Sequence, residues 1–260
     1  MNQPLITSLA NPLIKKVRAL RQRKMRTETG LFIAEGLHHV GEALEAGWDI
    51  DSILYSPDVL TSGFARDLIA RFTPIMQPVS AQIMESLADK DNPQGIMAVV
   101  HQKSTRLVDL KSVHVGVAIV SPQDPGNVGT ILRTLDAVGA DALFLLDGST
   151  DPYHPTSVRA SMGTIFWKLI VQTSFNEFME WSQQAGYQRI ATSAHAEQNY
   201  CDLKPNLPWI LVLGSEQKGL SAEQIKACDV SVSLPMHGRT SSLNLAVAAG
   251  VLLYQFSFQQ

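Results

Sequence analysis

The sequence predicts an α/β protein in which a small N-terminal α/β domain precedes a C-terminal domain built on a doubly wound parallel sheet. Two observations carry this prediction. Short apolar runs alternate with amphipathic stretches along most of the 260 residues. In the second half, three of these runs are continuously apolar, as expected for strands covered on both faces; they are Val113–Val120, Ala142–Leu146 and Trp209–Leu213.

In the first half, the apolar runs predict strands at Leu31–Ala34, Ser52–Tyr55, Ile75–Pro78 and Gly95–His101. Amphipathic spacing predicts helices at Gly36–Ala46, Ser62–Phe72 and Ser80–Ala88, the last beginning after an Ser80 cap. The polar stretch Gln102–Arg106 has few groups able to build a core. We therefore predict a first domain at residues 1–104, a linker at 105–111 and a second domain at 112–260.

In the second half, a fourth strand is predicted at Val230–Leu234, and helices are predicted at Val128–Val138, Asn176–Ala185 and Leu245–Phe256. The last helix carries no charged residue, and a helix that is apolar all round must be buried all round. Either it lies between the sheet and a neighbouring helix, or part of it faces another subunit. The sequence leaves both possibilities open.

The composition is that of an ordinary globular chain, with 45% hydrophobic and 17% charged residues. No apolar run reaches the ~18 residues of a membrane span, and the N-terminus lacks the order of a secretory signal. Cys201 and Cys228 show no metal-ligand spacing, so no metal is expected. Two cysteines can form at most one disulfide bridge, and so few cysteines are typical of proteins from a reducing compartment. We therefore expect a cytoplasmic location.

The charge is distributed unevenly, although the net charge is only −3. Seven basic residues precede the first carboxylate, that of Glu28; they are Lys15, Lys16, Arg18, Arg21, Arg23, Lys24 and Arg26. A polyanion would therefore bind this segment rather than the rest of the chain. The alternative is a solvated basic helix.

Ligands of open α/β sheets bind at the carboxyl ends of the strands, so the loops after the strong strands are the first places to search. The first such loop starts at Ser121, and its prolines and glycines predict a rigid turn with Asn127 as the cap of the next helix. Arg133 falls on the helix face opposite the apolar positions. From periodicity alone, Arg133 is a solvated surface residue.

The second loop, Gly214–Ser221, has two glycines at the separation of a phosphate-binding loop but lacks the lysine that must follow the second glycine. No GxGxxG follows the strands either, so a dinucleotide site is not indicated. The simpler interpretation is a strand-to-helix turn in which Ser221 caps the next helix.

The third loop, Pro235–Asn244, places ten residues, many small and polar, between a strand and an apolar helix. A long loop of this kind is costly unless it binds something. His237 has no second histidine or carboxylate at metal or catalytic spacing, so we expect an exposed loop residue.

Together, the three loops resemble motifs 1, 2 and 3 of the SpoU (TrmH) RNA 2′-O-ribose methyltransferases. The matching positions of motif 1 are Asn127, Gly129, Arg133, Thr134 and Gly139. Those of motif 2 are Leu213, Gly214, Ser215, Glu216, Gly219, Leu220 and Ser221. Those of motif 3 are Leu234, Pro235, Met236, Gly238, Ser242, Leu243, Asn244, Leu245, Val247, Ala248 and Gly250.

Other segments extend the resemblance. Asp151–Pro155 and Val158–Gly163 are similar to the same family, and Thr7–Lys15 and Phe32–Gly36 resemble the substrate-binding domain of many members. The chain departs from the family pattern at Ser121, Pro122 and His154.

The resemblance implies a SPOUT fold, in which the C-terminal part of a parallel sheet forms a trefoil knot, and a homodimer joined through the C-terminal helices. It implies S-adenosylmethionine as cofactor. By position, the cofactor-binding residues would be Leu213, Gly214, Gly219, Leu234, Met236 and Leu243.

The resemblance also implies the chemistry. Arg133 would act at the ribose 2′-hydroxyl, and we expect activation and phosphate positioning because an arginine is a poor base. The other implied catalytic residues are Asn127, Glu216, Ser242 and Asn244, which would hold Arg133, the loops and the target nucleotide in register. The seven basic N-terminal residues would bind RNA phosphates, and the extra domain favours ribosomal RNA over tRNA.

Two other functions remain open from the sequence. One is a catalytically silent RNA-binding relative with the same fold, against which the presence of Asn127, Arg133, Glu216 and Asn244 argues. The other is a nucleotide-binding regulatory α/β protein, which the missing phosphate-loop lysine disfavours.

Overall fold

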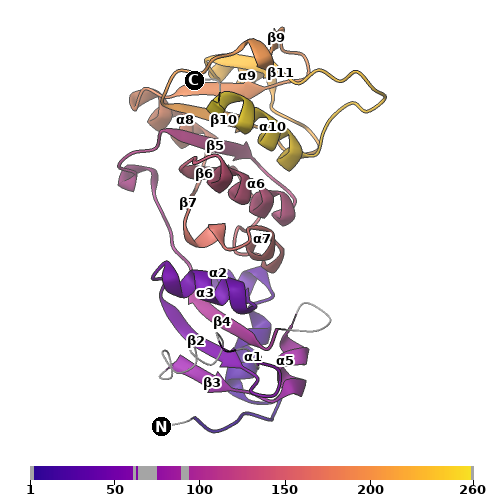
Figure 1. Ribbon diagram of the computed structural model, residues 1–260. Helices are drawn as coiled ribbons and strands as arrows, with labels where there is room; N and C mark the ends of the chain where they lie inside the picture. The colour runs from indigo at the N-terminus through magenta and orange to yellow at the C-terminus, as the bar shows by residue number, and fades with distance from the viewer. Residues whose placement is uncertain (1–2, 61–62, 64–74, 89–93, 259–260) are drawn as a thin grey trace. The chain divides into compact units, whose positions relative to one another are not determined.

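The computed structural model describes residues 3–60, 63, 75–88 and 94–258 of the chain (Figure 1). The helix predicted at Ser62–Phe72 lies outside the described residues. The chain divides into two compact units, Met1–Lys103 with Tyr153–Trp167, and Ser104–Pro152 with Lys168–Gln260. The sequence division assigned residues 153–167 to the second part, whereas their contacts group them with the first unit.

The first unit contains a sheet that, among the described residues, has four strands in the order β1-β4-β2-β3. Its strands are β1 (Leu31–Glu35), β2 (Ile50–Tyr55), β3 (Met76–Pro78) and β4 (Ile96–His101). β4 pairs antiparallel with β1 and β2, and β2 pairs parallel with β3. Its helices are α1 (Pro12–Ala19), α2 (Arg23–Thr29), α3 (Leu37–Glu45) and α5 (Ala81–Leu87). All four predicted strands and the two predicted helices that are described are confirmed within a few residues.

Helices α1 and α5 bury one face against this sheet. Ile14 and Val17 of α1 and Ile83 of α5 are fully buried in one cluster with Leu54 of β2. Ser80 caps α5 as predicted, because its Oγ accepts a hydrogen bond from Ile83 N at 3.4 Å.

The segment Tyr153–Trp167 completes the first unit, and it contains α7 (Pro155–Ala160) and the short helix η3 (Thr164–Phe166). The ring centroids of Phe32 and Tyr153 lie 4.7 Å apart. Trp48 Nε1 donates a hydrogen bond to Phe166 O at 2.9 Å. These contacts account for the position of the segment, because each aromatic ring buries a large apolar area and the buried indole N–H of Trp48 keeps a hydrogen-bond partner.

The second unit is built on an all-parallel sheet with the order β7-β6-β5-β10-β8-β11-β9 among its described strands. The strands are β5 (Val115–Val120), β6 (Ala142–Leu146), β7 (Leu169–Thr173), β8 (Gln188–Thr192), β9 (Gln198–Asn199), β10 (Trp209–Leu213) and β11 (Val230–Ser233). Its helices are α6 (Pro125–Ala137), α8 (Phe175–Gln184), α9 (Ala222–Ala227) and α10 (Leu245–Phe258), with short turns η2 (Leu107–Asp109) and η4 (Tyr200–Asp202). The predicted parallel-sheet α/β class is confirmed, and the trefoil knot stays a prediction.

The sequence analysis did not predict β7, β8 and β9. β7 is an edge strand with only Val171 buried, and β9 has two residues, so neither forms a continuous apolar run. β8 carries a charged residue, Arg189, in its interior, and that residue is accommodated by Asp229. These strands depend on pairing with neighbours, which a local pattern does not record.

The prediction that Asn127 caps α6 is wrong. The helix begins at Pro125, and Asp124 is its cap, with Oδ1 accepting a hydrogen bond from Gly126 N at 2.7 Å. Proline is favoured at the first helical position because its fixed φ suits the helix. Asn127 therefore lies inside the first turn, and its side chain is free to bind elsewhere.

Helix α10 packs against α6 and β10 (Figure 1). The buried face comprises Leu245, Ala246, Ala249, Leu252, Leu253 and Phe256. The opposite face exposes four apolar side chains, Val247, Val251, Tyr254 and Phe258, by 51, 37, 51 and 68%. The helix is thus buried on one side by its own unit and not all round.

Within the described ranges, no helix is long and apolar enough to cross a bilayer. The same residues contain no group of three or more His, Cys, Asp or Glu side chains arranged to hold a metal ion.

Candidate active site

The sheet of the second unit reverses its winding between β5 and β10. Across the sheet, β6 and then β7 lie on one side of β5. On the other side of β5 lie β10, β8, β11 and β9, in that order. Ligands of open α/β sheets bind outside the carboxyl ends of the strands at such a reversal. The loops after β5 and β10 are therefore the natural place for a site.

Glu216, in the loop after β10, holds the loop after β5. Its Oε2 accepts a hydrogen bond from Gln123 N at 3.0 Å, and its Oε1 accepts one from Asp124 N at 3.2 Å. Burial by itself would raise the pKa of Glu216, but hydrogen bonds from Asn127 and from these backbone groups outweigh it and lower the pKa. Glu216 is therefore an anion that joins two loops and is not a proton donor at neutral pH.

A chain of side-chain hydrogen bonds extends from Glu216 to the last helix. Asn127 Nδ2 donates to Glu216 Oε1 at 2.9 Å, and Asn244 Nδ2 donates to Asn127 Oδ1 at 3.0 Å. Asn244 Oδ1 in turn accepts from Ala246 N at 2.9 Å, at the start of α10. Because a carboxylate only accepts hydrogen bonds, Glu216 fixes the orientation of both amides. Residues from motifs 1, 2 and 3 thus form one polar connection.

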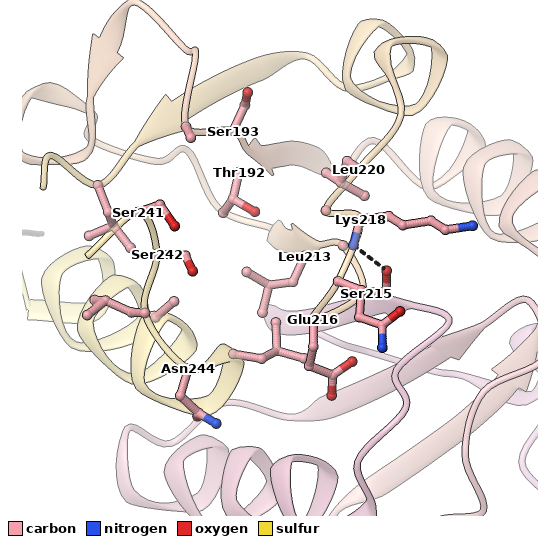
Figure 2. A pocket seen from close by; sticks show the side chains of 18 of the residues that line it. Thr192, Ser193, Leu213, Ser215, Glu216, Lys218, Leu220, Ser241, Ser242 and Asn244 are labelled. Carbon is pink, nitrogen blue, oxygen red and sulfur yellow. Dashed lines mark hydrogen bonds between the residues drawn. The ribbon is translucent and has the colours of Figure 1, made fainter. Parts of the chain in front are cut away.

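A pocket of about 620 Å³ opens beside this connection. Figure 2 shows Thr192, Leu213, Ser241 and Ser242 around the same hollow. The predicted cofactor-binding residues all line it, namely Leu213, Gly214, Gly219, Leu234, Met236 and Leu243. Glu216, Ser242 and Asn244 line it as well, whereas Asn127 and Arg133 do not. The pocket is thus lined by the loops after β10 and β11, and the loop after β5 is joined to them through Asn127 without lining the pocket. The role of each residue stays a prediction.

Gly214 allows the loop after β10 to fold back on itself. A Cβ at this position would lie 1.9 Å from the backbone carbon of Gly219. Gly219 N also donates to Ser215 O at 2.9 Å, which closes the turn. Any side chain at position 214 would force the loop open, so this wall of the pocket requires glycine.

Arg133 lies on α6, six residues after Asn127, and is exposed as its helical position predicts. In the part of the chain that the structure describes, no hydrogen bond or ion pair engages its guanidinium group. An exposed, charged, fork-shaped donor is available to an incoming phosphate or hydroxyl group. His237 is also exposed, as predicted.

The sequence analysis missed one wall of the pocket, Thr192–His195, at and after the end of β8. Thr192 Oγ1 donates to Val212 O at 3.4 Å, and Ser193 Oγ accepts from His195 N at 3.2 Å. The signal was present as small polar residues directly after a short run, Ile190–Ala191. It was not used because β8 itself was not predicted.

Six of the seven basic N-terminal residues lie on α1 and α2, and Arg21 lies in the break between them at residues 20–22. Lys16 pairs with Asp51 at 2.9 Å, and Arg21 Nη2 donates to Leu87 O at 3.0 Å and also to Ala88 O. Lys15, Arg18, Arg23 and Lys24 are exposed. These four side chains and the exposed Arg21, which is held by backbone carbonyls, are the accessible part of the predicted surface.

Arg26 is placed differently from the expectation. It is 1% exposed, and its Nη1 donates to Leu20 O and Arg21 O, each at 2.8 Å. The guanidinium group therefore closes the break between α1 and α2. A buried side chain cannot reach RNA phosphates, so Arg26 is no part of the accessible basic surface.

A parallel-sheet α/β unit with a pocket at the carboxyl edge of its sheet is typical of small-ligand-binding α/β proteins. Comparisons with known proteins narrow this class to RNA methyltransferases. Residues 114–254 match the SpoU rRNA Methylase family, and residues 11–98 match an MRM3-like substrate binding domain. The chain belongs to the SpoU rRNA methylase family.

Relatives of known name support this assignment over most of the chain. A 23S rRNA (uridine(2479)-2′-O)-methyltransferase of Streptomyces viridochromogenes is 33% identical, covering 91% of this chain and 85% of the relative. The 23S rRNA (guanosine(2553)-2′-O)-methyltransferase RlmP of Bacillus subtilis is 30% identical, with 96 and 97% covered. An AdoMet-bound rRNA methyltransferase from Sinorhizobium meliloti has a TM-score of 0.88 at 35% identity, with 97 and 96% covered.

The pocket residues fit S-adenosylmethionine. The pocket lies within the range of about 300–1,000 Å³ that is usual for small-ligand sites. Its wall includes Leu243, a leucine left 40% exposed, together with the hydroxyl groups of Ser241 and Ser242. Uncovered apolar surface suits an adenine ring, and adjacent hydroxyl groups suit the polar edges of a nucleoside.

Proposed function

We propose that this protein transfers a methyl group from S-adenosylmethionine to a ribose 2′-hydroxyl of ribosomal RNA. The observation that carries the proposal is a pocket between the loops after β10 and β11, to which the loop after β5 is tied by the hydrogen bonds between Glu216, Asn127 and Asn244. The two 2′-O-methyltransferases described above are named for 23S rRNA, which favours ribosomal RNA over tRNA as the substrate.

The pocket walls hold the methyl donor through Leu213, Gly214, Gly219, Leu234, Met236 and Leu243. When bound, S-adenosylmethionine supplies a methyl group on a positively charged sulfur, which needs an aligned nucleophile and no metal ion. Ser242, in the same wall, offers a hydroxyl group to the bound nucleotide or donor. These side chains exclude water and orient the reactants.

Arg133 prepares the ribose hydroxyl. Its exposed guanidinium group binds the phosphate next to the target sugar and donates a hydrogen bond toward the 2′-oxygen, which lowers the cost of losing the proton. A guanidinium remains protonated in proteins, so Arg133 does not take the proton itself. As the 2′-oxygen gains the methyl group, its proton would pass to solvent water, and the donor would leave as the neutral thioether. Asn127, Glu216 and Asn244 keep the start of α6 fixed, and therefore the helix that carries Arg133.

The first unit binds RNA through the accessible basic residues Lys15, Arg18, Arg23 and Lys24. Lysine and arginine side chains grip phosphates without reading sequence. Residues 1–104 form the RNA-binding domain in this proposal, and the linker is residues 105–111. Lys16, which pairs with Asp51, and Arg21, which binds Leu87 O, add to the positive electrostatic potential of this surface without contacting phosphates directly.

Helix α10 is the proposed homodimer interface. Val247, Val251, Tyr254 and Phe258 follow one another at three- and four-residue steps, so they form one apolar stripe on its exposed face. An apolar stripe without charges is covered by a second copy more readily than by water. We propose a cytoplasmic protein, since its substrate class is made there.

The deciding experiment is transfer of a radiolabelled methyl group from S-adenosylmethionine to deproteinised 23S rRNA, followed by mapping of 2′-O-methyl sites. The expected result is label at a ribose of a discrete position, together with donor binding in calorimetry and no binding of ATP. RNA binding without any methyl transfer to ribosomal RNA would contradict the proposal.

A further inference from the structure

Two residues next to the site have an unusual backbone. Ser121 and Asp147 both have a φ of 49°, and among the described residues Met162 is the other non-glycine residue in this left-handed region. Side chains rarely adopt this conformation, because the Cβ atom crowds the backbone. Ser121 directly follows β5, and Asp147 directly follows the neighbouring strand β6. The two strained residues therefore lie side by side at the carboxyl edge of the sheet.

A hydrogen bond joins these residues. Ser121 Oγ donates to Asp147 O at 2.5 Å, and Ser121 N donates to Leu146 O at 2.8 Å. Asp147 is itself held from the other side, since its Oδ1 accepts from Phe175 N at 2.8 Å. Ser121 is thus attached to a point that the neighbouring strands keep fixed.

The chain leaving Ser121 leads directly to Glu216. Pro122 O accepts from Thr150 N at 3.0 Å, and the next two backbone N–H groups, those of Gln123 and Asp124, are the ones that bind Glu216. The backbone conformation of Ser121 sets the direction of these groups. A change at Ser121 therefore reaches Glu216 through only two or three peptide units.

We infer that Ser121 is a positioning residue for methyl transfer: its hydroxyl group, bound to the carbonyl of Asp147, holds the β5–α6 loop where Gln123 and Asp124 bind Glu216. The inference rests on the proposed function. Ser121 belongs to none of the three motifs, and it acts through Glu216 and Asn127 rather than by touching the reactants. Its contribution is to keep the first turn of α6, and hence Arg133, in register.

The test compares Ser121→Ala and Ser121→Gly in the full-length chain. Both substitutions remove the hydroxyl group, but glycine adopts the left-handed backbone without strain, so Ser121→Gly keeps the fold even if Ser121→Ala does not. Ser149→Ala is the matched control. Ser149 Oγ donates to Leu146 O at 2.8 Å in the same region, so its loss removes a similar bond, whereas the backbone N–H that reaches Pro122 belongs to the next residue, Thr150.

The readouts are kcat, KM for RNA, donor affinity and the pKa of Glu216 followed by carboxyl NMR, with Glu216→Gln for assignment. In both Ser121 variants we expect kcat to fall about three- to tenfold, the size expected for one misaligned hydrogen bond. The pKa of Glu216 should rise toward its ordinary value, while donor affinity stays unchanged. Ser149→Ala should lower thermal stability without moving kcat or this pKa.

An unchanged kcat and an unchanged Glu216 pKa in Ser121→Gly would overturn the inference. So would an equal shift in Ser149→Ala, because the effect would then be general loosening of the loops. The titration of Glu216 does not require turnover. A parent protein without methyltransferase activity would therefore contradict the proposed function, whereas the NMR result would still decide whether Ser121 positions Glu216.

Discussion

Asn127 donates its amide Nδ2 to Glu216 Oε1 at 2.9 Å, although 89 residues separate the two in sequence. The bond ties the first turn of α6 to the loop after β10 and leaves Asn127 Oδ1 facing Asn244. A single amide therefore connects the loop of motif 1 with those of motifs 2 and 3. This connection makes several outcomes testable.

Replacing Asn127 by alanine should lower kcat/KM by about ten- to a hundredfold. The substitution removes one hydrogen-bond partner each from Glu216 and Asn244, and a partly buried polar group that loses its hydrogen bond costs about 1–3 kcal/mol. Single-turnover methyl transfer measures the effect. Asn199→Ala is a suitable control, since Asn199 Oδ1 accepts a hydrogen bond from Cys201 N and is not part of the connection between Glu216, Asn127 and Asn244. Equal losses in both variants would refute the special role of Asn127.

Arg133→Ala should abolish methyl transfer and leave the melting temperature and donor affinity unchanged. Its side chain is exposed, so its removal breaks no packing, whereas the ribose hydroxyl loses its activating donor. Calorimetry with S-adenosylmethionine and a transfer assay on the same preparation separate the two effects. Arg133→Lys should recover little activity because it lacks the two-pronged donor. Full activity in Arg133→Ala would remove this residue from the mechanism.

Neutralising Lys15, Arg18, Arg23 and Lys24 together should weaken RNA binding and flatten its salt dependence. Each lost phosphate contact lowers the slope of log K against log salt by about 0.7–0.9. Filter binding between 50 and 300 mM salt, about the range over which such contacts weaken strongly, measures the slope. A matched variant neutralises Arg106, Lys111, Lys204 and Lys226 in the second unit. Identical slopes in the two variants would argue against a dedicated RNA-binding surface in the first unit.

Tyr254→Glu should convert the protein to a monomer. A carboxylate placed in the middle of the apolar stripe on α10 would be desolvated by a second copy at a cost of several kcal/mol. Sedimentation equilibrium of the parent and the variant measures the difference. Val108→Glu supplies the control, because Val108 is 80% exposed and lies away from α10 in sequence and contacts. A parent that is monomeric at micromolar concentration would disprove the proposed interface.

Asp229→Asn should reduce stability at neutral pH and flatten its fall in acid. A paired hydrogen bond from Arg189, with 2.9 and 2.7 Å distances, lowers the pKa of Asp229 despite burial that would raise it. Because the folded-state pKa lies below the unfolded one, this stabilisation is present above about pH 4 and is lost as pH falls through the folded value.

The expected loss at pH 7 is about 1–2 kcal/mol after allowance for solvent, since the Asp229 side chain is 41% exposed. Urea unfolding at a series of pH values between about 2 and 7 covers this titration. Asp109→Asn, which breaks the exposed pair with Arg106, should change the curve little. Parallel curves for Asp229→Asn and the parent in acid would contradict the assignment.

The sequence by itself determined the fold class, the buried strands and the three loops. Ala142–Leu146 and Trp209–Leu213 are continuously apolar, and such runs form buried strands whatever lies around them. Gly214, Glu216 and Asn244 lie in loops that the positions of the predicted strands singled out, and the resemblance to the SpoU motifs assigned these three residues to one site. The exposed position of Arg133 followed from helical spacing alone.

Only the tertiary structure decided the partners of these residues. Asn127 looked like a helix cap but binds Glu216, Arg26 looked like a phosphate ligand but is buried against backbone carbonyls, and Thr192 joined the pocket unpredicted. Local patterns report whether a segment is helix or strand, since that depends on neighbours three or four residues away. Which strand ends meet, and therefore which polar groups find each other, is settled when the sheet assembles.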